Sequence, residues 1–193
     1  MLLTKQILEN HGACGECMYW YISNGEPTSV EETIEKLLLS DEREKFGWSN
    51  WLLSCVLPLD DKIRYAIFAA ELVIDIFEKR FPEDKRPRNA IEAARKYLSH
   101  KDAAAADAAY AAARAAADAV DYAARAARTA AYAARAAARE AYVANAVRAA
   151  AYADYAADYA ARAADAAYVD RAEAYVETYT KIINYGLSLL KSK

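Results

Sequence analysis

The sequence predicts an all-α protein, a multi-helix bundle in which Ala-rich helices pack closely together. Three observations support this fold class. Only five of the 193 residues are Gly and four are Pro, which leaves few positions for turns. Apolar residues recur at helical spacing along most of the chain. Residues 102–176 contain no Gly or Pro and are mostly Ala, the residue with the highest helix propensity.

The first 25 residues predict two short helices separated by clear stop signals. One helix is expected from Thr4 to Asn10, ending at His11-Gly12. The second is expected from Ala13 to Asn24. Gly25 follows where a helix commonly ends with a residue in the left-handed conformation.

Two further helices complete the N-terminal region. Thr28 and Ser29 each precede a glutamate by three residues, so either can form a capping box for a helix over residues 30–39. The next helix ends at Leu57-Pro58, because proline disfavours helical geometry in the residue before it. Its large apolar side chains lie at helical spacing and are Trp48, Trp51, Leu52, Leu53 and Val56.

A longer helix is predicted from Asp61 to about Lys79, with Asp60 as its N-cap. Its apolar face comprises Ile63, Ile67, Ala70, Ile74 and Phe77. After Phe81-Pro82, a charged loop leads to a helix from Arg88 to Leu98. Pro87 suits the first turn of that helix, where the missing N–H is not needed.

The Ala-rich tract begins at Asp102, a predicted N-cap, and is too long to form one helix. Residues 102–176 as a single helix would span on the order of 110 Å, so we expect the tract to fold back on itself. Breaks are predicted near Thr129 and Asn145. A final helix follows, with Gly186 as a candidate kink. We divide the chain into a short-helix region, residues 1–58, and an Ala-rich bundle, residues 59–193, that together form one compact unit.

Charge and sequence patterns exclude several classes of function. The formal net charge is −3, and Asp alternates with Arg in the Ala-rich tract, which disfavours binding to a nucleic acid polymer. Neither an export signal nor a membrane-spanning stretch is recognisable, so a cytoplasmic location with no membrane contact is expected. Three cysteines in such a chain are expected to be reduced.

The candidates for metal binding and catalysis are few. His11, Cys14 and Cys17 form H-x-x-C-x-x-C, and Cys55 could supply a fourth zinc ligand. A single CxxC is half of a zinc site, and its two cysteines also suit one packed helix face, so we favour packing over zinc. The only other histidine is His100, and no catalytic motif surrounds either histidine. We therefore expect no cofactor, no metal and no enzymatic activity.

Arginines are the best candidates for partner binding. In the segment Asp84–Asn89, Arg86 and Arg88 flank a rigid proline at a helix start, a position that favours anions. The alternative is that both arginines bind nearby acids such as Glu83 or Asp84. Further candidates lie on one stripe of the Ala-rich tract and are Arg125, Arg128, Tyr132, Arg135 and Arg139. If these residues do not bind the partner, the Trp- and Tyr-rich N-terminal helices are the next candidate surface.

One segment resembles a known family. The sequence AELV at residues 70–73, followed by IFEKRFPEDKRPRNAIEAAR at residues 76–95, is similar to the hallmark of helical immunity proteins from bacterial polymorphic toxin systems. The sequence AARAA at residues 123–127 is similar to a second part of the family pattern. The resemblance covers roughly residues 66–138. The chain departs from the pattern after Ala127, where Arg128, Thr129 and Tyr132 replace the Gly and His expected there.

The resemblance implies a non-enzymatic inhibitor that binds and neutralises a toxin. Residues 11–20 instead resemble small phage-encoded proteins, which extends the range of partners to a defence effector and makes the chain a candidate anti-defence protein. The alternative is a sponge that sequesters a small anionic nucleotide signal in a pocket lined by Tyr and Arg. A homo-oligomer would help such a protein by lining sites from two subunits.

Overall fold

A computed structural model describes residues 1–102, 104–109, 111, 132, 155–156 and 171–191 of the chain. Eight helices are defined within these residues. The described residues contain no strand, and the only β contact among them is an isolated antiparallel bridge between Leu2 and Ser29. The predicted all-α fold class is therefore confirmed.

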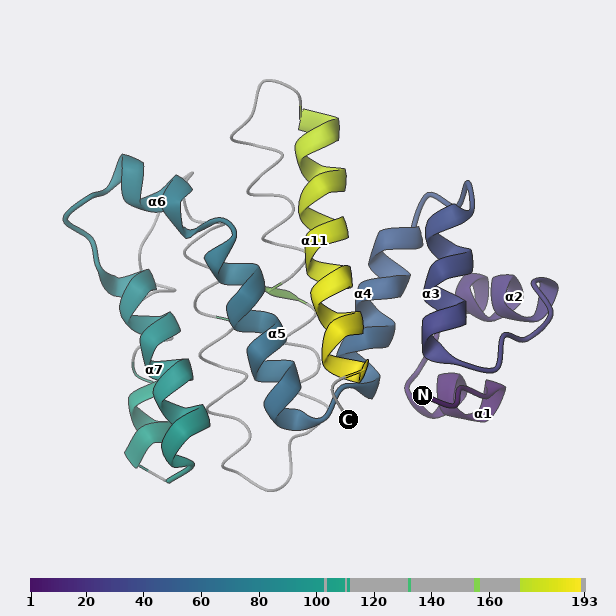
Figure 1. Cartoon of the computed structure of the whole chain (residues 1–193), viewed down its shortest axis with the longest axis horizontal. Coiled ribbons are helices and arrows are strands. Elements are labelled where there is room, and N and C mark those ends of the chain that lie inside the picture. Colours follow the sequence, from purple (N-terminus) through teal and green to yellow (C-terminus); the bar gives the residue numbers. More distant parts are fainter. Residues whose placement is uncertain (103, 110, 112–131, 133–154, 157–170, 192–193) are drawn as a thin grey trace.

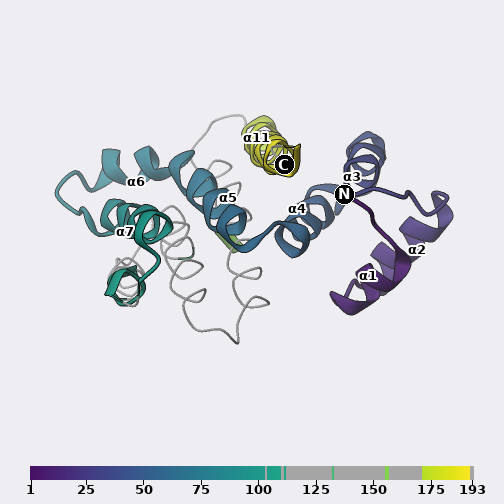
Figure 2. The same ribbon diagram turned by 60° about the horizontal axis from the view of Figure 1, so that its bottom comes forward.

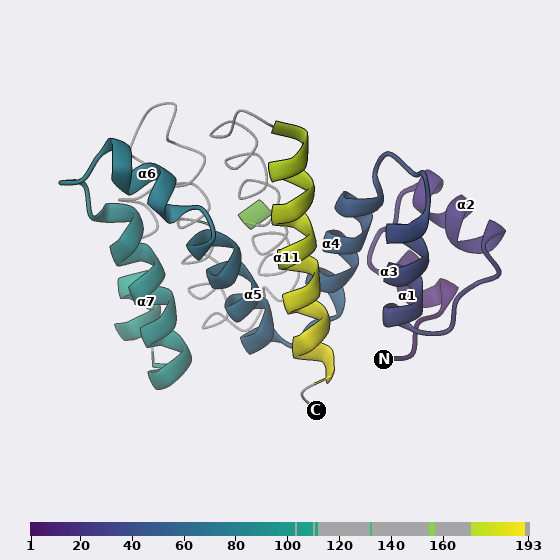
Figure 3. The ribbon, with the colours of Figure 1, turned by 45° about the horizontal axis from the view of Figure 1, so that its top comes forward.

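Five helices lie side by side in one row (Figures 1 and 3). In spatial order they are α7 (Arg86–His100), α5 (Leu59–Glu71), α11 (Arg171–Lys191), α4 (Lys45–Val56) and α3 (Val30–Leu39). Each helix packs against the next in this order. The C-terminal helix α11 thus lies between α4 and α5, which are consecutive in the sequence, and contacts both.

The remaining helices lie at the two ends of the row (Figure 2). Helices α1 (Lys5–Asn10) and α2 (Gly15–Ser23) lie beyond α3, and α6 (Ile74–Arg80) connects α5 to the loop before α7. The chain start is tied to α3 by backbone hydrogen bonds from Leu3 N to Thr28 O, at 2.9 Å, and from Val30 N to Met1 O, at 3.0 Å.

The predicted capping box of α3 is confirmed, and α1 has a side-chain cap that was not predicted. Thr4 Oγ1 accepts a hydrogen bond from Ile7 N at 3.3 Å and caps α1. Ser29 Oγ accepts from Glu32 N at 3.1 Å, and the Glu32 carboxylate accepts in return from Thr28 N at 3.1 Å. Both candidate residues therefore take part in capping α3. Gly25 adopts φ +82°, in the left-handed region expected after α2.

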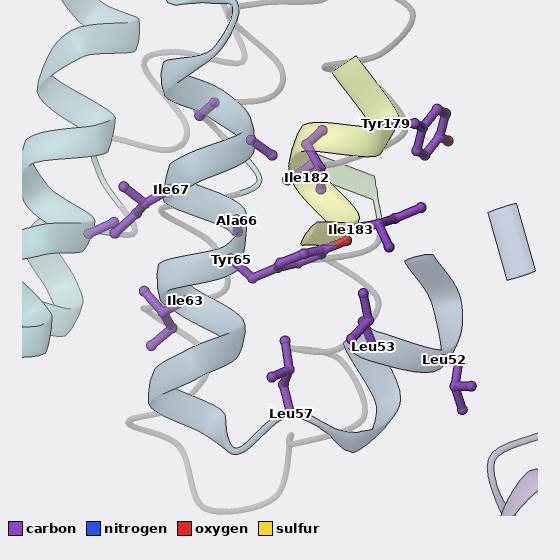
Figure 4. Packing of buried hydrophobic residues seen from close by; sticks show 14 of the residues in the cluster. Leu52, Leu53, Leu57, Ile63, Tyr65, Ala66, Ile67, Tyr179, Ile182 and Ile183 are labelled. Atoms are coloured by element: carbon purple, nitrogen blue, oxygen red, sulfur yellow. The ribbon is translucent and has the colours of Figure 1, made fainter. Parts of the chain in front are cut away.

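The core is closely packed where α11 contacts α4 and α5. A Cβ atom on Gly186 would lie 2.8 Å from both Leu53 Cδ1 and Tyr65 Cε2. Figure 4 shows Tyr65 pointing from α5 toward α11, close to Leu53 and Ile183. The Tyr65 hydroxyl donates a hydrogen bond to Asn50 Oδ1 on α4 at 2.7 Å. Gly186, considered as a kink from the sequence, lies inside a continuous helix and permits this close approach.

The prediction of one helix from Asp61 to Lys79 is wrong. The chain breaks at Leu72 and Val73, and Val73 has φ −126° and ψ −2°. Val73, Ile74 and Phe77 are all buried, so the break redirects the apolar face that α5 could not continue to bury. Neither Gly nor Pro marks the position, which explains why the sequence did not reveal it.

Helix α5 also begins earlier than predicted, at Leu59, directly after Pro58. Asp60 is not the N-cap but lies in the first turn, where both of its carboxylate oxygens accept from Lys101 Nζ at 2.7 Å. In the same turn region, Lys62 is only 7 % exposed and donates to Cys55 O at 3.1 Å, near the end of α4. Burial lowers the pKa of Lys62 below its usual range.

The described part of the Ala-rich tract agrees with the prediction for its start. Asp102 Oδ1 accepts from Ala105 N at 2.6 Å, and residues 104–109 are helical. Among the described residues of the tract, five alanines are buried and are Ala105, Ala106, Ala109, Ala156 and Ala174. The predicted breaks near Thr129 and Asn145 lie outside the described residues. Among the helices that are described, none combines the length and the apolar character needed to cross a membrane.

Candidate functional site

The first turn of α7 carries the first two predicted binding residues, Arg86 and Arg88. Asp84 Oδ1 accepts from the backbone N and Nε of Arg86 at 3.1 and 2.9 Å, and Asp84 Oδ2 accepts from Nη2 at 2.6 Å. Arg88 extends to α6, where its Nε and Nη2 donate to Glu78 Oε1 and Oε2 at 2.9 and 2.6 Å. Asp75 lies 3.7 Å from the same Arg88 nitrogen. Both guanidinium groups therefore face carboxylates of the chain itself.

These contacts change the proton affinities of the groups involved. Hydrogen bonds from the Arg86 side chain hold the pKa of Asp84 below its usual range, and those from Arg88 do the same for Glu78. Hydrogen bonding to Glu78 in turn raises the pKa of Arg88. Any partner anion would have to compete with these acceptors. The geometry favours the alternative in which the two arginines pair with nearby acids, and their role in binding stays a prediction.

The rest of the predicted set lies in the Ala-rich tract. Tyr132 is half-buried against the core, and its ring centroid lies 5.4 Å from that of Tyr155. The described residues do not include Arg125, Arg128, Arg135 or Arg139, so their place on a common stripe with Tyr132 stays a prediction.

Other cations around α5 and α7 also have partners within the chain. Arg64 contacts Asp61 within α5 at 2.8 Å. Two pairs connect α5 to α7 or its end, namely Arg95 with Glu71, and Lys101 with Asp60 at 2.7 Å. The charged side chains named here therefore serve mainly to hold α5, α6 and α7 together.

A different arrangement lies at the other end of the row. The start of α2, the loop between α3 and α4, and the first turn of α4 enclose an open pocket of about 590 Å³. We call it the α2–α4 pocket. Its lining consists of Gly15, Glu16, Tyr19, Trp20, Glu42, Arg43, Glu44 and Trp48. Trp20 is 5 % exposed and anchors α2 in the core, whereas Tyr19, one residue earlier, is 75 % exposed.

The charged side chains of the α2–α4 pocket are unpaired. Glu16, Glu42, Arg43 and Glu44 are all exposed, and within the described structure none of their side chains makes an ion pair or hydrogen bond. The surrounding region is acidic as well. Residues 1–58 contain four basic and nine acidic residues, a formal charge of −5, whereas the other 135 contain 21 and 19, a charge of +2.

The cysteines beside this pocket have structural roles. Cys14 Sγ accepts a hydrogen bond from Cys17 N at 3.3 Å and caps α2. Cys17 is buried, and burial raises the pKa of its thiol to about 11. No group of three or more His, Cys, Asp or Glu side chains in the described residues is placed to hold a metal ion. The expected absence of zinc stays a prediction, which elemental analysis of the purified protein can check.

Comparison with known proteins identifies the family. A family model described as "Imm-5 like putative immunity protein" matches residues 60–191. The chain belongs to this family. The resemblance recognised in residues 66–138 is therefore confirmed, and the match extends it from α5 through α11. No curated protein and no solved structure matches the chain. Immunity proteins are generally non-enzymatic.

Only one of the two candidate surfaces lies within the residues that match the family. Arg86 and Arg88, at the start of α7, lie inside the matched residues, and the α2–α4 pocket precedes them. Sequence reasoning named the Trp- and Tyr-rich N-terminal helices only as a second choice and did not identify the pocket. Glu16 and Tyr19, three residues apart, were a local signal for one wall. The opposite wall, residues 42–48, meets this one only in the folded chain, so its place could not be predicted from local sequence.

Proposed function

We propose that this protein binds a toxin directly and neutralises it without catalysing a reaction. The observation that carries the proposal is the match of residues 60–191 to the immunity-protein family. A protein of this kind needs a stable scaffold and an exposed surface complementary to its target. The packed row of helices fits the first requirement, and the α2–α4 pocket or the arginine set fits the second.

The titratable groups of the described residues support a binding protein over an enzyme. Both histidines are exposed, and neither lines the α2–α4 pocket. His100 Nδ1 lies 3.1 Å from Lys96 O, one turn earlier in α7. Cys17, a potential nucleophile, is buried with a raised pKa that keeps it protonated. These groups have roles in packing and helix ends that do not require a reaction.

Co-expression tests the proposal. The chain is expressed together with the toxin or defence effector encoded by a neighbouring gene, and survival of the host is counted. We expect survival to be restored and the purified pair to appear as an intact complex in native mass spectrometry. The mass of the toxin should be unchanged after incubation with the chain. Toxin neutralised without a complex, or with an altered mass, would contradict inhibition by binding.

Native mass spectrometry of the chain alone tests the sponge alternative. A bound molecule of nucleotide mass in the freshly purified protein would favour sequestration of a signal over neutralisation of a toxin. The same spectrum reports whether the chain is a monomer or a homo-oligomer. An empty chain that forms a complex only with the toxin is the result we expect.

The predicted arginine set is tested in the same assay. Arg86→Ala, Arg88→Ala and the combined Arg125→Ala/Arg128→Ala variant remove candidate contacts from two parts of the family region. Loss of one arginine from a desolvated charge pair with a partner costs about 2–5 kcal/mol of binding. Full neutralisation by all three folded variants would place the contact surface elsewhere.

A further inference from the structure

We propose that the α2–α4 pocket binds a segment of the partner protein that carries Lys or Arg side chains. This inference rests on the proposed function and names the chemistry of the partner at one surface. It follows from three properties of the pocket, namely its aromatic walls, its unpaired carboxylates and its size.

The aromatic walls suit a cationic side chain. Tyr19 and the half-buried Trp48 expose aromatic surface to the pocket, and Trp20 forms the buried side. Lys and Arg are attracted to aromatic faces, most strongly to Trp. Ile22, one turn after Tyr19 on α2, is also exposed at 45 %, so the apolar surface continues beyond the pocket. A large exposed aromatic residue such as Tyr19 is typical of binding hot spots.

The charges select a cation over an anion. Three carboxylates and one guanidinium line the pocket, a formal charge of −2 from Glu16, Glu42, Glu44 and Arg43. Because these carboxylates have no partner in the described structure, an incoming cation need not displace one. This contrasts with Arg86 and Arg88, whose guanidinium groups are already occupied. The formal charge of −5 on residues 1–58 also steers basic partners toward this end of the molecule.

The size of the pocket indicates a segment rather than a single ion. Its volume of about 590 Å³ lies within the range of roughly 300–1,000 Å³ that holds ligands in protein clefts. The carboxylates come from both walls, Glu16 on α2 and Glu42 with Glu44 beside α4. A short peptide segment with two or more basic side chains could contact both walls at once.

Titration with defined peptides tests the inference directly. The probe is the acetylated, amidated peptide Gly-Lys-Gly-Arg-Gly-Lys, and its matched control has Glu in place of each Lys and Arg. Indole N–H signals in two-dimensional NMR report the site, since Trp20 and Trp48 line the pocket and Trp51 does not. We expect the basic peptide to shift the Trp48 signal more than that of Trp51, and the acidic peptide to shift neither.

Three variants separate the pocket from the general charge of the region. The double variant Glu42→Lys/Glu44→Lys should lower the affinity for the basic peptide by about 10-fold or more. Tyr19→Ala, at an exposed position, should lower the affinity for the same peptide by about 2- to 5-fold. Glu35→Lys is the control for charge reversal outside the pocket, because Glu35 on α3 is exposed, does not line the pocket and has no partner among the described residues. It should change the affinity by less than about 2-fold. The NMR spectra of the variants verify that each is folded.

The outcomes separate this inference from the proposed function. Three results would overturn the pocket as a site for basic segments. They are an equal loss of peptide affinity in Glu35→Lys, preferential binding of the acidic peptide, and a Trp48 signal that the basic peptide does not shift. In co-expression with the toxin, Glu42→Lys/Glu44→Lys should lose neutralisation, whereas Glu35→Lys should keep it. If the native chain and both variants neutralise equally well, the pocket inference fails and the proposed function stands. If the native chain neutralises nothing, the proposed function fails, and the peptide titration still decides what the pocket binds.

Discussion

Charged side chains are used differently at the two ends of the row of helices. Around α5, α6 and α7, the guanidinium groups of Arg64, Arg86, Arg88 and Arg95 each contact a carboxylate of the same chain. Around the α2–α4 pocket, three carboxylates and Arg43 contact no charged partner among the described residues. The comparison teaches that a cluster of arginines in the sequence is not by itself a free binding surface. Ionic groups left unpaired by the fold are the better guide.

Charged side chains also contribute differently to stability in the two regions. Exposed ion pairs contribute about 0.2–1 kcal/mol each, and those that connect different helices also fix how the helices lie. Arg88 with Glu78 connects α7 to α6 in this way, and Arg95 with Glu71 connects α7 to α5. The carboxylates of the α2–α4 pocket form no ion pair of this kind with the described residues. They remain free to meet a partner.

The largest effect is expected where the two regions join. Gly186→Val places side-chain atoms where even a Cβ would lie 2.8 Å from Leu53 Cδ1 and Tyr65 Cε2. Tyr65 is fully buried and its hydroxyl is hydrogen-bonded to Asn50, so the ring cannot easily move. We expect a loss of about 3 kcal/mol in the free energy of unfolding, measured by urea denaturation.

Gly47→Ala is the matched control for this change. Gly47 also lies in a helix, but its added Cβ would meet only Glu44 Oε2, at an ordinary contact distance of 3.6 Å. Alanine should stabilise α4 there by about 0.5 kcal/mol through its higher helix propensity. Separate unfolding transitions for the N-terminal helices and the family region in the native chain would show that α11 does not couple them.

A smaller effect should distinguish a paired arginine from an unpaired one. Arg88→Ala removes a bidentate pair whose side chains are 34 % and 23 % exposed, so we expect a loss of about 1 kcal/mol. Arg43→Ala removes an exposed guanidinium without a partner and should change the stability by less than about 0.5 kcal/mol. Equal destabilisation by the two variants, measured by the same denaturation, would remove the distinction between the two ends of the row.

The helical character and most helix boundaries were predictable because their signals are local. Ser29 and Asp102 cap the helices that follow them, and Gly25 ends α2 in the left-handed conformation, as expected. Each of these features depends on residues within four positions in the sequence. The break at Val73 has no such signal, because it arises from which side chains the neighbouring helices can bury.

The candidate site was harder to predict for the same reason. The sequence shows that Arg86 lies near Asp84, but the partner of Arg88 is Glu78, ten residues away on α6. Likewise, Glu16 and Glu44 are far apart in the sequence and share a pocket only because α2 and α4 pack near one another. Tertiary packing decides which charges are paired and which remain available.

Acidification should weaken the ion pair that Arg88 forms with Glu78. Arg88 holds the folded-state pKa of Glu78 below its ordinary value of 4.5, so the unfolded chain takes up a proton first as the pH falls. The stabilisation from this pair is fully present above about pH 4.5 and is lost as the pH falls through the lower, folded-state pKa. The difference in stability between the native chain and Arg88→Ala should therefore be constant near neutral pH and shrink below pH 4.5. A difference that grows on acidification would contradict the pairing.

The last expected effect concerns the reactivity of the cysteines next to the pocket, which reports how firmly α2 holds its wall. Cys14 is exposed at the N-cap of α2, whereas Cys17 is buried with a pKa of about 11. Compared with a thiol whose pKa has its ordinary value of 9.0, Cys17 should carry about 100-fold less thiolate near pH 8. Iodoacetamide should therefore alkylate Cys14 first, the half-buried Cys55 more slowly, and Cys17 only when α2 opens, as followed by peptide mass spectrometry. Cys14→Ser should remove the fast phase while changing the stability by less than about 1 kcal/mol, because serine also caps a helix. If Cys17 reacts as fast as Cys14, α2 opens often in solution, and the aromatic wall of the pocket formed by Tyr19 and Trp20 is not held in place for a partner.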